Sequence, residues 1–540
     1  MLCALLFALF GNMKQANAYD FSATVGSNTL YFNIVSGTTN VELTYPATNA
    51  SWNGFTKPTG SLNLPGTVTN NGTTYTVTEI GSSAFSECSG ITAITIPNTM
   101  TSVDSYAFYG CTGLTSVTIN SNAVASKTYS SFYSLNRTFG SQVTSYTFGG
   151  SVTTIGVCAL YGCTNVTSVT LGNSVSSINY SAFEGCTGLT TVDLSNNLTT
   201  IGNAAFKDCT QLTSVTFHDL VTSIADFAFE NCTNLERVNI TSLETWCAIE
   251  FESQFSNPLL YAHRLYRNNS EYSVMSIPVG VESIGNYAFI GCTYLTQVVF
   301  DNALHSIGSS AFSGCTNLAR VDIANNVTSI GYGAFTGCTS LNEVHIGTLQ
   351  SWCNINFADG DANPLTIAHH LYYGSNEITA LNIPGNVTSI ANYAFSGCSY
   401  LTSVTLPNSV TSIGSHAFTG CTGLTQVYTP SLYDWCQISF ANETANPLSY
   451  AHHLHYSSGS YSEITDINIS NLSLTSIKDY AFAGGTSIET VTLSNNLSSI
   501  GQYAFKDCIG LSSVIIPSAV QTIGNYAFDG CLALTSVTIN

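Results

Sequence analysis

The chain has 540 residues, of which only 8% are charged, and 31 Asp and Glu residues outnumber 11 Lys and Arg residues. The resulting formal net charge of -20 argues against nucleic acid and against anionic membrane surfaces, because both attract clustered basic residues. We also expect no membrane insertion, since no segment after the N-terminus is apolar over the length of a bilayer span.

The N-terminus indicates a signal peptide over residues 1–18. Leu2 to Phe10 form an apolar run too short to cross a bilayer. Ala16, Asn17 and Ala18 then place small residues at the positions that a signal peptidase recognises. The alternative is a buried apolar strand. Cleavage before Tyr19 predicts a protein that is secreted or displayed at the cell surface, with an N-terminal β cap over residues 19–77.

From residue 78 to residue 540 one phrase recurs, mostly in steps of 23 residues, with Phe after Ala as its marker. In Leu114-Thr-Ser-Val117-Thr-Ile119 apolar residues alternate with polar ones, which predicts a half-buried strand. Ile-Gly before the marker predicts a second short strand and a turn. This period and pattern are typical of leucine-rich repeats. We therefore predict a mostly β solenoid of about 18 coils with parallel stacked strands, including a degenerate coil near Tyr146 and Phe148.

Thirteen of the 18 cysteines lie three residues after the marker position. In an exported protein this number invites a disulfide interpretation. The alternative is a column of small buried side chains, which is how free cysteines often pack. Each coil offers one equivalent cysteine, and one copy carries Gly485 instead, so the column is favoured.

Three long steps contain related inserts, at about residues 241–273, 347–377 and 430–463. Each begins with Ser or Thr before a short amphipathic stretch, which predicts a capped helix. An Asn-Pro pair follows and predicts a second short helix. We expect Trp246, Trp352 and Trp435 to form the cores of these helical inserts.

The third insert contains NPLSYAHHLHY, which raises the question of a metal site. Only His263, His369 and His452 are shared by all three inserts, and Arg264 follows the first of them. Adjacent residues on a helix point about 100° apart, and no carboxylate stands at a fixed offset from the histidines. We therefore expect a partly buried histidine bonded to the backbone, and we predict neither a metal site nor a cofactor.

The phrase IGxxAFxxCxxLTSVxIPxxVTS and the W-C…NPLxxAHxLY inserts resemble the BspA-like leucine-rich repeat proteins. This resemblance covers roughly 460 of the 540 residues. It implies a solenoid that is exported, displayed, and associated with adhesion to host matrix proteins and other cells. Members often carry a C-terminal anchoring segment. The chain ends in the coil LTSVTIN, so we expect either a fragment or a partner surface over that end.

Exposed strand positions of the middle coils predict a binding surface. Most coils carry Ser and Thr there, whereas the middle coils carry charged, amide and aromatic side chains, which suit specific binding on a rigid sheet. The alternative is that these residues vary by sequence drift on a solvent-exposed face without a binding role. The predicted binding residues are Arg237, Asn239, Gln297, Arg320, Asp322, Glu343, His345, Gln426 and Tyr428.

We predict an adhesion module that binds a host or neighbouring-cell protein through this face, with a glycan as a second partner class. One alternative is a structural spacer or decoy antigen without a specific ligand. A surface-glycan hydrolase is a more remote alternative, because it needs two positioned carboxylates. The sequence has no GxSxG, HExxH or phosphate-loop motif, so we expect no enzyme.

Overall fold

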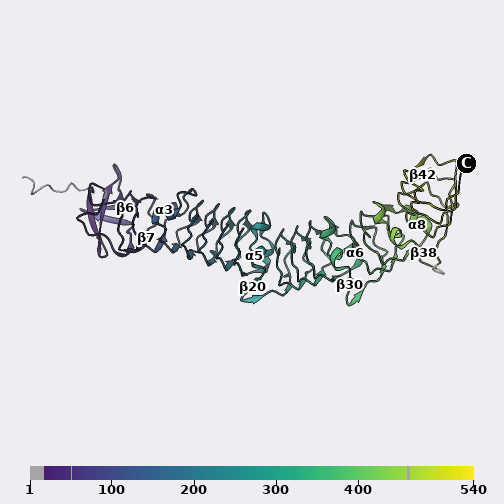
Figure 1. Ribbon diagram of the computed structural model, residues 1–540, viewed down its shortest axis with the longest axis horizontal. Helices are drawn as coiled ribbons and strands as arrows, with labels where there is room; N and C mark the ends of the chain where they lie inside the picture. Colours follow the sequence, from purple (N-terminus) through teal and green to yellow (C-terminus); the bar gives the residue numbers. More distant parts are fainter. Residues whose placement is uncertain (1–17, 50, 459–461) are drawn as a thin grey trace, which may run out of the picture. The chain divides into compact units, whose positions relative to one another are not determined.

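The computed structural model describes residues 18–49, 51–458 and 462–540 (Figure 1). The chain divides into two compact units, the first ending at Glu271 and the second beginning at Tyr272. The predicted signal peptide lies outside the described residues, apart from Ala18. Among the described helices, none has the length and apolar character needed to cross a membrane.

The N-terminal cap is a small mixed sheet in the order β1-β2-β3-β6-β5, with β8 paired to β6. Its strands are β1 (Phe21–Val25), β2 (Asn28–Ile34), β3 (Asn40–Thr44), β5 (Thr67–Asn70), β6 (Thr73–Ile80) and β8 (Ser102–Val103). β6 runs antiparallel to β5 and parallel to β8, so it joins the cap to the first short strand of the solenoid. The indole Nε1 of Trp52 adds a hydrogen bond of 3.1 Å to the carbonyl oxygen of Ala84 in the first coil.

A regular coil contains one longer and one shorter strand, as in β16 (Ser214–Phe217) and β17 (Ser223–Ile224). In β16 Val215 and Phe217 are buried, whereas Ser214 and Thr216 are half-exposed. The alternation follows from the two-residue period of a strand. Parallel pairing in register places Val192, Val215 and Val238 of three successive coils in one buried row. The predicted solenoid is therefore confirmed.

In the first unit the longer strands form a ten-stranded sheet, and the shorter ones form a five-stranded sheet. The longer strands are β4 (Gly60–Asn63), β7 (Ile91–Ile96), β9 (Ser116–Ile119), β10 (Ser145–Phe148), β12 (Ser168–Leu171), β14 (Thr191–Asp193), β16, β18 (Arg237–Ile240), β20 (Leu265–Arg267) and β21 (Ser270–Glu271). The shorter ones are β11 (Thr154–Ile155), β13 (Ser177–Ile178), β15 (Thr200–Ile201), β17 and β19 (Glu250–Phe251). Only the terminal pair β20–β21 is antiparallel among the pairs of the ten-stranded sheet.

In the second unit the longer strands form three successive sheets of six, four and four strands. They are β22 (Val274–Ser276), β24 (Gln297–Val299), β26 (Arg320–Ile323), β28 (Glu343–Ile346), β30 (Leu371–Tyr373) and β31 (Asn376–Glu377); then β32 (Ala380–Asn382), β34 (Ser403–Thr405), β36 (Gln426–Thr429) and β38 (Leu454–Tyr456); then β39 (Asp466–Asn468), β41 (Thr490–Thr492), β43 (Ser513–Ile516) and β45 (Ser536–Ile539). The shorter strands are β23 (Ser283–Ile284), β25 (Ser306–Ile307), β27 (Ser329–Ile330), β29 (Asn356–Phe357), β33 (Ser389–Ile390), β35 (Ser412–Ile413), β37 (Ser439–Phe440), β40 (Ser476–Ile477), β42 (Ser499–Ile500) and β44 (Thr522–Ile523). Three of the four longer-strand sheets end within an insert, at β21, β31 and β38, and the last ends at β45.

The marker phenylalanines stack in the core of each unit. Ring centroids of Phe183 and Phe206 lie 5.0 Å apart, and those of Phe289 and Phe312 lie 5.2 Å apart. The degenerate coil contains the predicted strand, β10, and two short helices that the sequence did not predict, α2 (Asn122–Ala125) and α3 (Leu135–Phe139). Phe139 of α3 continues the column, with its ring 5.1 Å from that of Phe108.

The cysteines form the predicted buried column. All 17 described cysteines are free thiols, and all except Cys531 are fully buried. Several thiols of the column donate hydrogen bonds to marker carbonyl oxygens one coil earlier, for example Cys209 to Phe183 at 3.2 Å and Cys315 to Phe289 at 3.2 Å. The column thus also satisfies backbone acceptors in the core, which matters because unpaired buried polar groups are costly.

Candidate binding surface

Each insert contains two short α-helices separated by a 3-10 helix. These are α4 (Leu243–Cys247), η1 (Gln254–Ser256) and α5 (Leu259–Ala262); α6 (Leu349–Cys353), η2 (Gly360–Ala362) and α7 (Leu365–Ala368); and α8 (Leu432–Gln437), η3 (Glu443–Ala445) and α9 (Leu448–Ala451). The predicted caps are present, because side chains of Ser242, Thr348 and Ser431 accept backbone N–H bonds at the starts of α4, α6 and α8. The side-chain oxygens of Asn257, Asn363 and Asn446 each accept an N–H bond of 2.9 Å at the second helix.

The tryptophans attach the inserts to the solenoid. Nε1 of Trp352 donates to the carbonyl oxygen of Ala394 at 2.8 Å, and Nε1 of Trp435 donates to that of Ala481 at 2.8 Å. In a regular coil the equivalent alanine carbonyl accepts the marker N–H of the preceding coil, as Ala205 does from Phe183. Where the preceding coil has an insert, the tryptophan indole N–H therefore takes the place of the marker backbone N–H as the donor to this alanine carbonyl. The tryptophan side chains are buried, as predicted.

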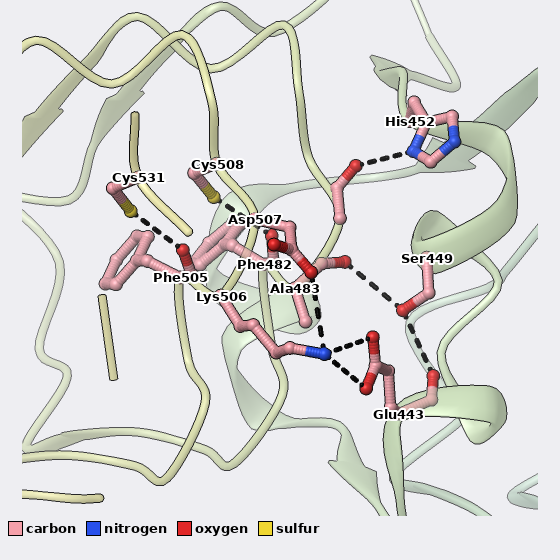
Figure 2. Close-up of polar contacts among 11 residues, drawn as sticks. Glu443, Ser449, His452, Phe482, Ala483, Phe505, Lys506, Asp507, Cys508 and Cys531 are labelled. Atoms are coloured by element: carbon pink, nitrogen blue, oxygen red, sulfur yellow. Dashed lines mark hydrogen bonds and ion pairs between the residues drawn. The ribbon is translucent and has the colours of Figure 1, made fainter. Parts of the chain in front are cut away.

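The shared histidines end the second helices with left-handed backbone, at φ angles of 60°, 64° and 66° for His263, His369 and His452. Nδ1 of His369 lies 2.7 Å from the carbonyl oxygen of Gly397, and Nδ1 of His452 lies 2.8 Å from that of Gly484 (Figure 2). A ring N–H at Nδ1 donates in this geometry. The predicted histidine–backbone bond is confirmed for these two residues, and it fixes each insert on the next coil. The expected partial burial is wrong, because His263, His369 and His452 are exposed.

Figure 2 also shows a cross-link between the third insert and the second coil after it. Nζ of Lys506 lies 2.9 and 2.8 Å from the two carboxylate oxygens of Glu443, and 3.5 Å from Asp507. Ser449 adds hydroxyl bonds to the carbonyl oxygens of Glu443 and Ala483. The lysine and the glutamate are 63 positions apart in the sequence.

The interpretation that no carboxylate stands at a fixed offset holds across the three inserts, because a glutamate lies eight positions after His263 and His369 but eleven after His452. The residue after each shared histidine pairs with a glutamate: Arg264 Nε with Glu271 at 3.7 Å, His370 Nδ1 with Glu377 at 2.6 Å, and His453 Nδ1 with Glu463 at 2.6 Å. In the first two inserts a tight hairpin, β20–β21 or β30–β31, folds the glutamate back. Each pair joins two groups, and no group of three described His, Cys, Asp or Glu side chains is arranged to hold a metal ion.

The predicted binding residues lie on three sheets. Arg237 and Asn239 lie on β18 of the first unit. In the second unit Gln297, Arg320 and Glu343 are register neighbours on β24, β26 and β28, and Asp322 and His345 are neighbours two positions further along. Gln426 and Tyr428 lie on β36 of the next sheet. The residues Gln297, Arg320, Asp322, Glu343 and His345 are therefore the contiguous part, here named the central cluster.

Ion pairs and hydrogen bonds connect the central cluster. Arg320 donates from Nε to Asp322 Oδ2 at 2.9 Å, and Gln297 Nε2 donates to the same oxygen at 3.0 Å. His345 Nε2 lies 3.0 Å from Glu343 Oε2. Burial alone raises the pKa of Asp322, but the bonds from Arg320 and Gln297 and the arginine charge hold it below its ordinary value. These bonds hold the side chains in one arrangement in the free protein.

The hairpins supply aromatic rings that the sequence interpretation missed. Tyr372 on β30 stacks on His345 with ring centroids 4.7 Å apart. In the first unit the guanidinium of Arg237 lies 4.3 Å from the ring centroid of Tyr266. In the next sheet the ring of His455 lies 5.2 Å from that of Tyr428. The signal was present, because the last residue of NPLxxAHxLY occupies this position.

A cavity of about 430 Å³ lies beside the central cluster. Arg320, Asp322 and His345 line it from the strands. Gly374, in the turn of the β30–β31 hairpin, also lines it, and its carbonyl oxygen lies 3.1 Å from His345 Nδ1. This recess is large enough for a partner side chain and has both charged and apolar walls.

Comparison with known proteins gave a family match over most of the coils. A family model described as a BspA type leucine rich repeat region matches residues 67–138, 136–255, 263–363, 365–445 and 453–540. No curated protein matches the sequence.

Solved structures to which the chain is similar come from several bacteria. A leucine-rich repeat protein from Bacteroides ovatus is 23% identical, over 78% of this chain and 100% of that one, with a TM-score of 0.39. A leucine rich cell surface protein from Faecalibacterium prausnitzii is 25% identical, over 78% and 97% of the two chains, with a TM-score of 0.28. The pneumococcal vaccine antigen PcpA is 14% identical, over 94% and 99%, with a TM-score of 0.28.

Proposed function

The chain belongs to the BspA-type leucine-rich repeat family, and we propose that it is an exported surface protein that binds a protein partner through the central cluster. The observation that carries this proposal is the prearranged network of Gln297, Arg320, Asp322, Glu343 and His345 beside a cavity. Rigid polar side chains around a recess bind with a small loss of side-chain entropy.

The uniform coils supply the contrast on which this proposal depends. Ser168 and Thr170 on β12, and Ser403 and Thr405 on β34, occupy the equivalent exposed positions. Short hydroxyl side chains give such strands little to distinguish one partner from another. The alternative function, a structural spacer or decoy antigen, would be served equally well by Ser and Thr at every exposed strand position.

We favour binding over catalysis because the carboxylates of the central cluster are already paired. Arg320 holds Asp322, and Glu343 lies within 3.0 Å of a His345 ring nitrogen. Glycoside hydrolysis needs one protonated and one ionised carboxyl group facing a sugar. A carboxyl whose pKa lies below its ordinary value, as that of Asp322 does, is a poor general acid.

The test is binding of the chain from Tyr19 to a panel of extracellular-matrix and cell-surface proteins by surface plasmon resonance. The test variant combines Arg320→Ser with Glu343→Ser. The matched control combines Lys506→Ser with Glu443→Ser, which also removes one cation and one carboxylate from an ion pair. We expect the test variant to lose at least tenfold in affinity and the control to bind as the parent does.

Equal binding by all three proteins contradicts a role for the central cluster. Absence of binding to every protein on the panel favours the spacer alternative. Arg237, Asn239, Gln426 and Tyr428 remain predictions, which single substitutions in the same assay address.

A further inference from the structure

We propose that a second pocket, beside α6 of the second insert, binds a neutral sugar ring. Thr348, Leu349, Gln350, Tyr373, Pro384 and Asn386 line this pocket, here named the α6 pocket, and its volume is about 360 Å³. That volume lies at the lower end of the range of roughly 300–1,000 Å³ that is typical of small-ligand sites. The proposal does not depend on protein binding by the central cluster.

The α6 pocket lies where the second insert meets the next coil. Leu349 and Gln350 form the first turn of α6, and Tyr373 ends β30. Pro384 and Asn386 belong to the turn that follows β32 in the next coil. The lining therefore comes from three elements, of which α6 and β30 are labelled in Figure 1.

Tyr373 provides an exposed ring on a rigid backbone. The residue is 55% exposed. On one side its backbone is in register with Ile346 of β28, and on the other with Asn376 of β31. A large ring left exposed on a paired strand offers a flat apolar face without a further loss of backbone entropy. Leu349 and Pro384 extend this apolar lining.

An amide pair forms the polar edge of the α6 pocket. Nδ2 of Asn386 donates to Oε1 of Gln350 at 2.6 Å, across 36 positions of the sequence. This bond fixes the orientation of both amides. Because each amide has an oxygen and an NH₂ group, the pair also presents the Gln350 NH₂ as a donor and the Asn386 oxygen as an acceptor.

This combination of groups favours a neutral sugar. All six lining residues are uncharged, so the pocket offers nothing to pair with the carboxylate of an acidic sugar or with a charged peptide side chain. A pyranose ring has a C–H face that packs on an aromatic ring and hydroxyl groups at its edge that bond to amides. An aliphatic peptide side chain fills the apolar part but leaves the amides unused, and unsatisfied polar groups lower affinity.

The other two inserts lack this combination, which makes the site specific to the second insert. In the first insert Glu244 and Arg267 stand at the positions of Gln350 and Tyr373. In the third insert Tyr433 stands at the position of Gln350. The third insert therefore retains a ring at Tyr456 without the amide pair, and it serves as an internal control.

The test is saturation-transfer NMR of the chain from Tyr19 with glucose, galactose, mannose and N-acetylglucosamine, each as its methyl glycoside. Sialic acid and a proline-rich peptide are the comparison probes. We expect saturation of the C–H protons on one face of at least one neutral sugar. Tyr373→Ala is expected to abolish this signal, and Gln350→Ala to weaken binding at least tenfold. Tyr456→Ala is expected to leave the signal unchanged.

Circular dichroism of each variant checks the fold. Tyr373→Ala should fold as the parent does, because the exposed Tyr373 side chain contributes little to stability. Saturation that persists in Tyr373→Ala overturns the proposal, as does absence of saturation with all four neutral sugars. Stronger binding of sialic acid overturns the neutral class, and Tyr373-dependent binding of the peptide alone assigns the α6 pocket to protein. Loss of protein binding in the Arg320→Ser, Glu343→Ser variant leaves the expected sugar signal intact, so the two proposals fail separately.

Discussion

The thiol of Cys508 donates a hydrogen bond to the carbonyl oxygen of Phe482, one coil earlier, at a distance of 3.2 Å (Figure 2). Cys531 repeats the bond to Phe505 at 3.1 Å. These two coils are thus linked to their neighbours by a thiol as well as by strand pairing and ring stacking. A thiol donates weakly, so the bond depends on its staying protonated inside the core.

Alkaline pH should destabilise the protein through this column. Burial raises the pKa of Cys338 from an ordinary value of 9.0 to about 12. A raised pKa contributes stability that is complete below about pH 9 and is lost as pH rises towards 12, because unfolding releases the proton. Each such thiol adds a slope of up to about 1.4 kcal/mol per pH unit. We expect the urea midpoint to fall steeply between pH 9 and pH 11.

Tyrosines also titrate in this range, so the control replaces Cys315 and Cys338 with Ala. Its urea midpoint should be lower than that of the parent at pH 8 but should fall less between pH 9 and pH 11. A parallel fall in both proteins would show that the thiols do not cause the pH dependence.

The amide of Asn363 should be essential for attaching the second insert. Its Nδ2 donates to the carbonyl oxygens of Tyr393 at 2.6 Å and Ala394 at 3.2 Å, and the side chain is fully buried. Asn363→Asp keeps the size but places a carboxylate against two carbonyl oxygens. We expect a loss of about 3 kcal/mol or more in the free energy of unfolding. Asn354→Asp, an exposed residue after α6, should change it by less than about 0.5 kcal/mol.

The solenoid could be predicted from the sequence because each coil repeats the same local signals. Alternation around Val117, the Gly turn and the marker Phe all specify one geometry, and stacking repeats it. The capping residues of α4, α6 and α8 were predictable for the same reason. The degenerate coil was less so, because Phe139 fills the marker column from a helix and lies outside the Ala-Phe pattern.

The surface groups could be predicted only in part, because they depend on hairpins that fold back across strands. Arg320 and Asp322 are two positions apart on one strand and were found from alternation. The pairing of His370 with Glu377 needs the β30–β31 turn. The bond from Asn386 to Gln350 joins an insert to the following coil. A one-dimensional period contains no information about such contacts between coils.

The stability that the central cluster contributes should be lost at acidic pH. The pKa of Asp322 is depressed, so its contribution is present above about pH 4 and is lost as pH falls through the lower folded pKa. Asp322→Asn should cost about 1 kcal/mol at pH 7, because Arg320 is partly exposed and solvent screens the pair. At pH 2.5 the difference should be smaller. Urea unfolding followed by fluorescence measures both values.

A cost at pH 2.5 as large as at pH 7 would contradict a role for the ionised carboxylate. The control is Asp507→Asn, which changes an exposed carboxylate.

The histidine at the end of α9 should depend on backbone conformation as much as on its ring. His452 has a φ of 66°, a left-handed conformation that costs a non-glycine residue about 1–2 kcal/mol. His452→Gly removes this strain together with the bond to Gly484, so the two effects should nearly cancel. His452→Ala loses the bond and keeps the strain, and should be less stable than the glycine variant by about 1 kcal/mol. Thermal unfolding ranks the variants, and His453→Ala, whose ring pairs with Glu463 at the surface, is the control. If the alanine and glycine variants unfold at the same temperature, the left-handed backbone of residue 452 does not affect stability. The bond from the ring to Gly484 then explains by itself why all three inserts have a histidine here.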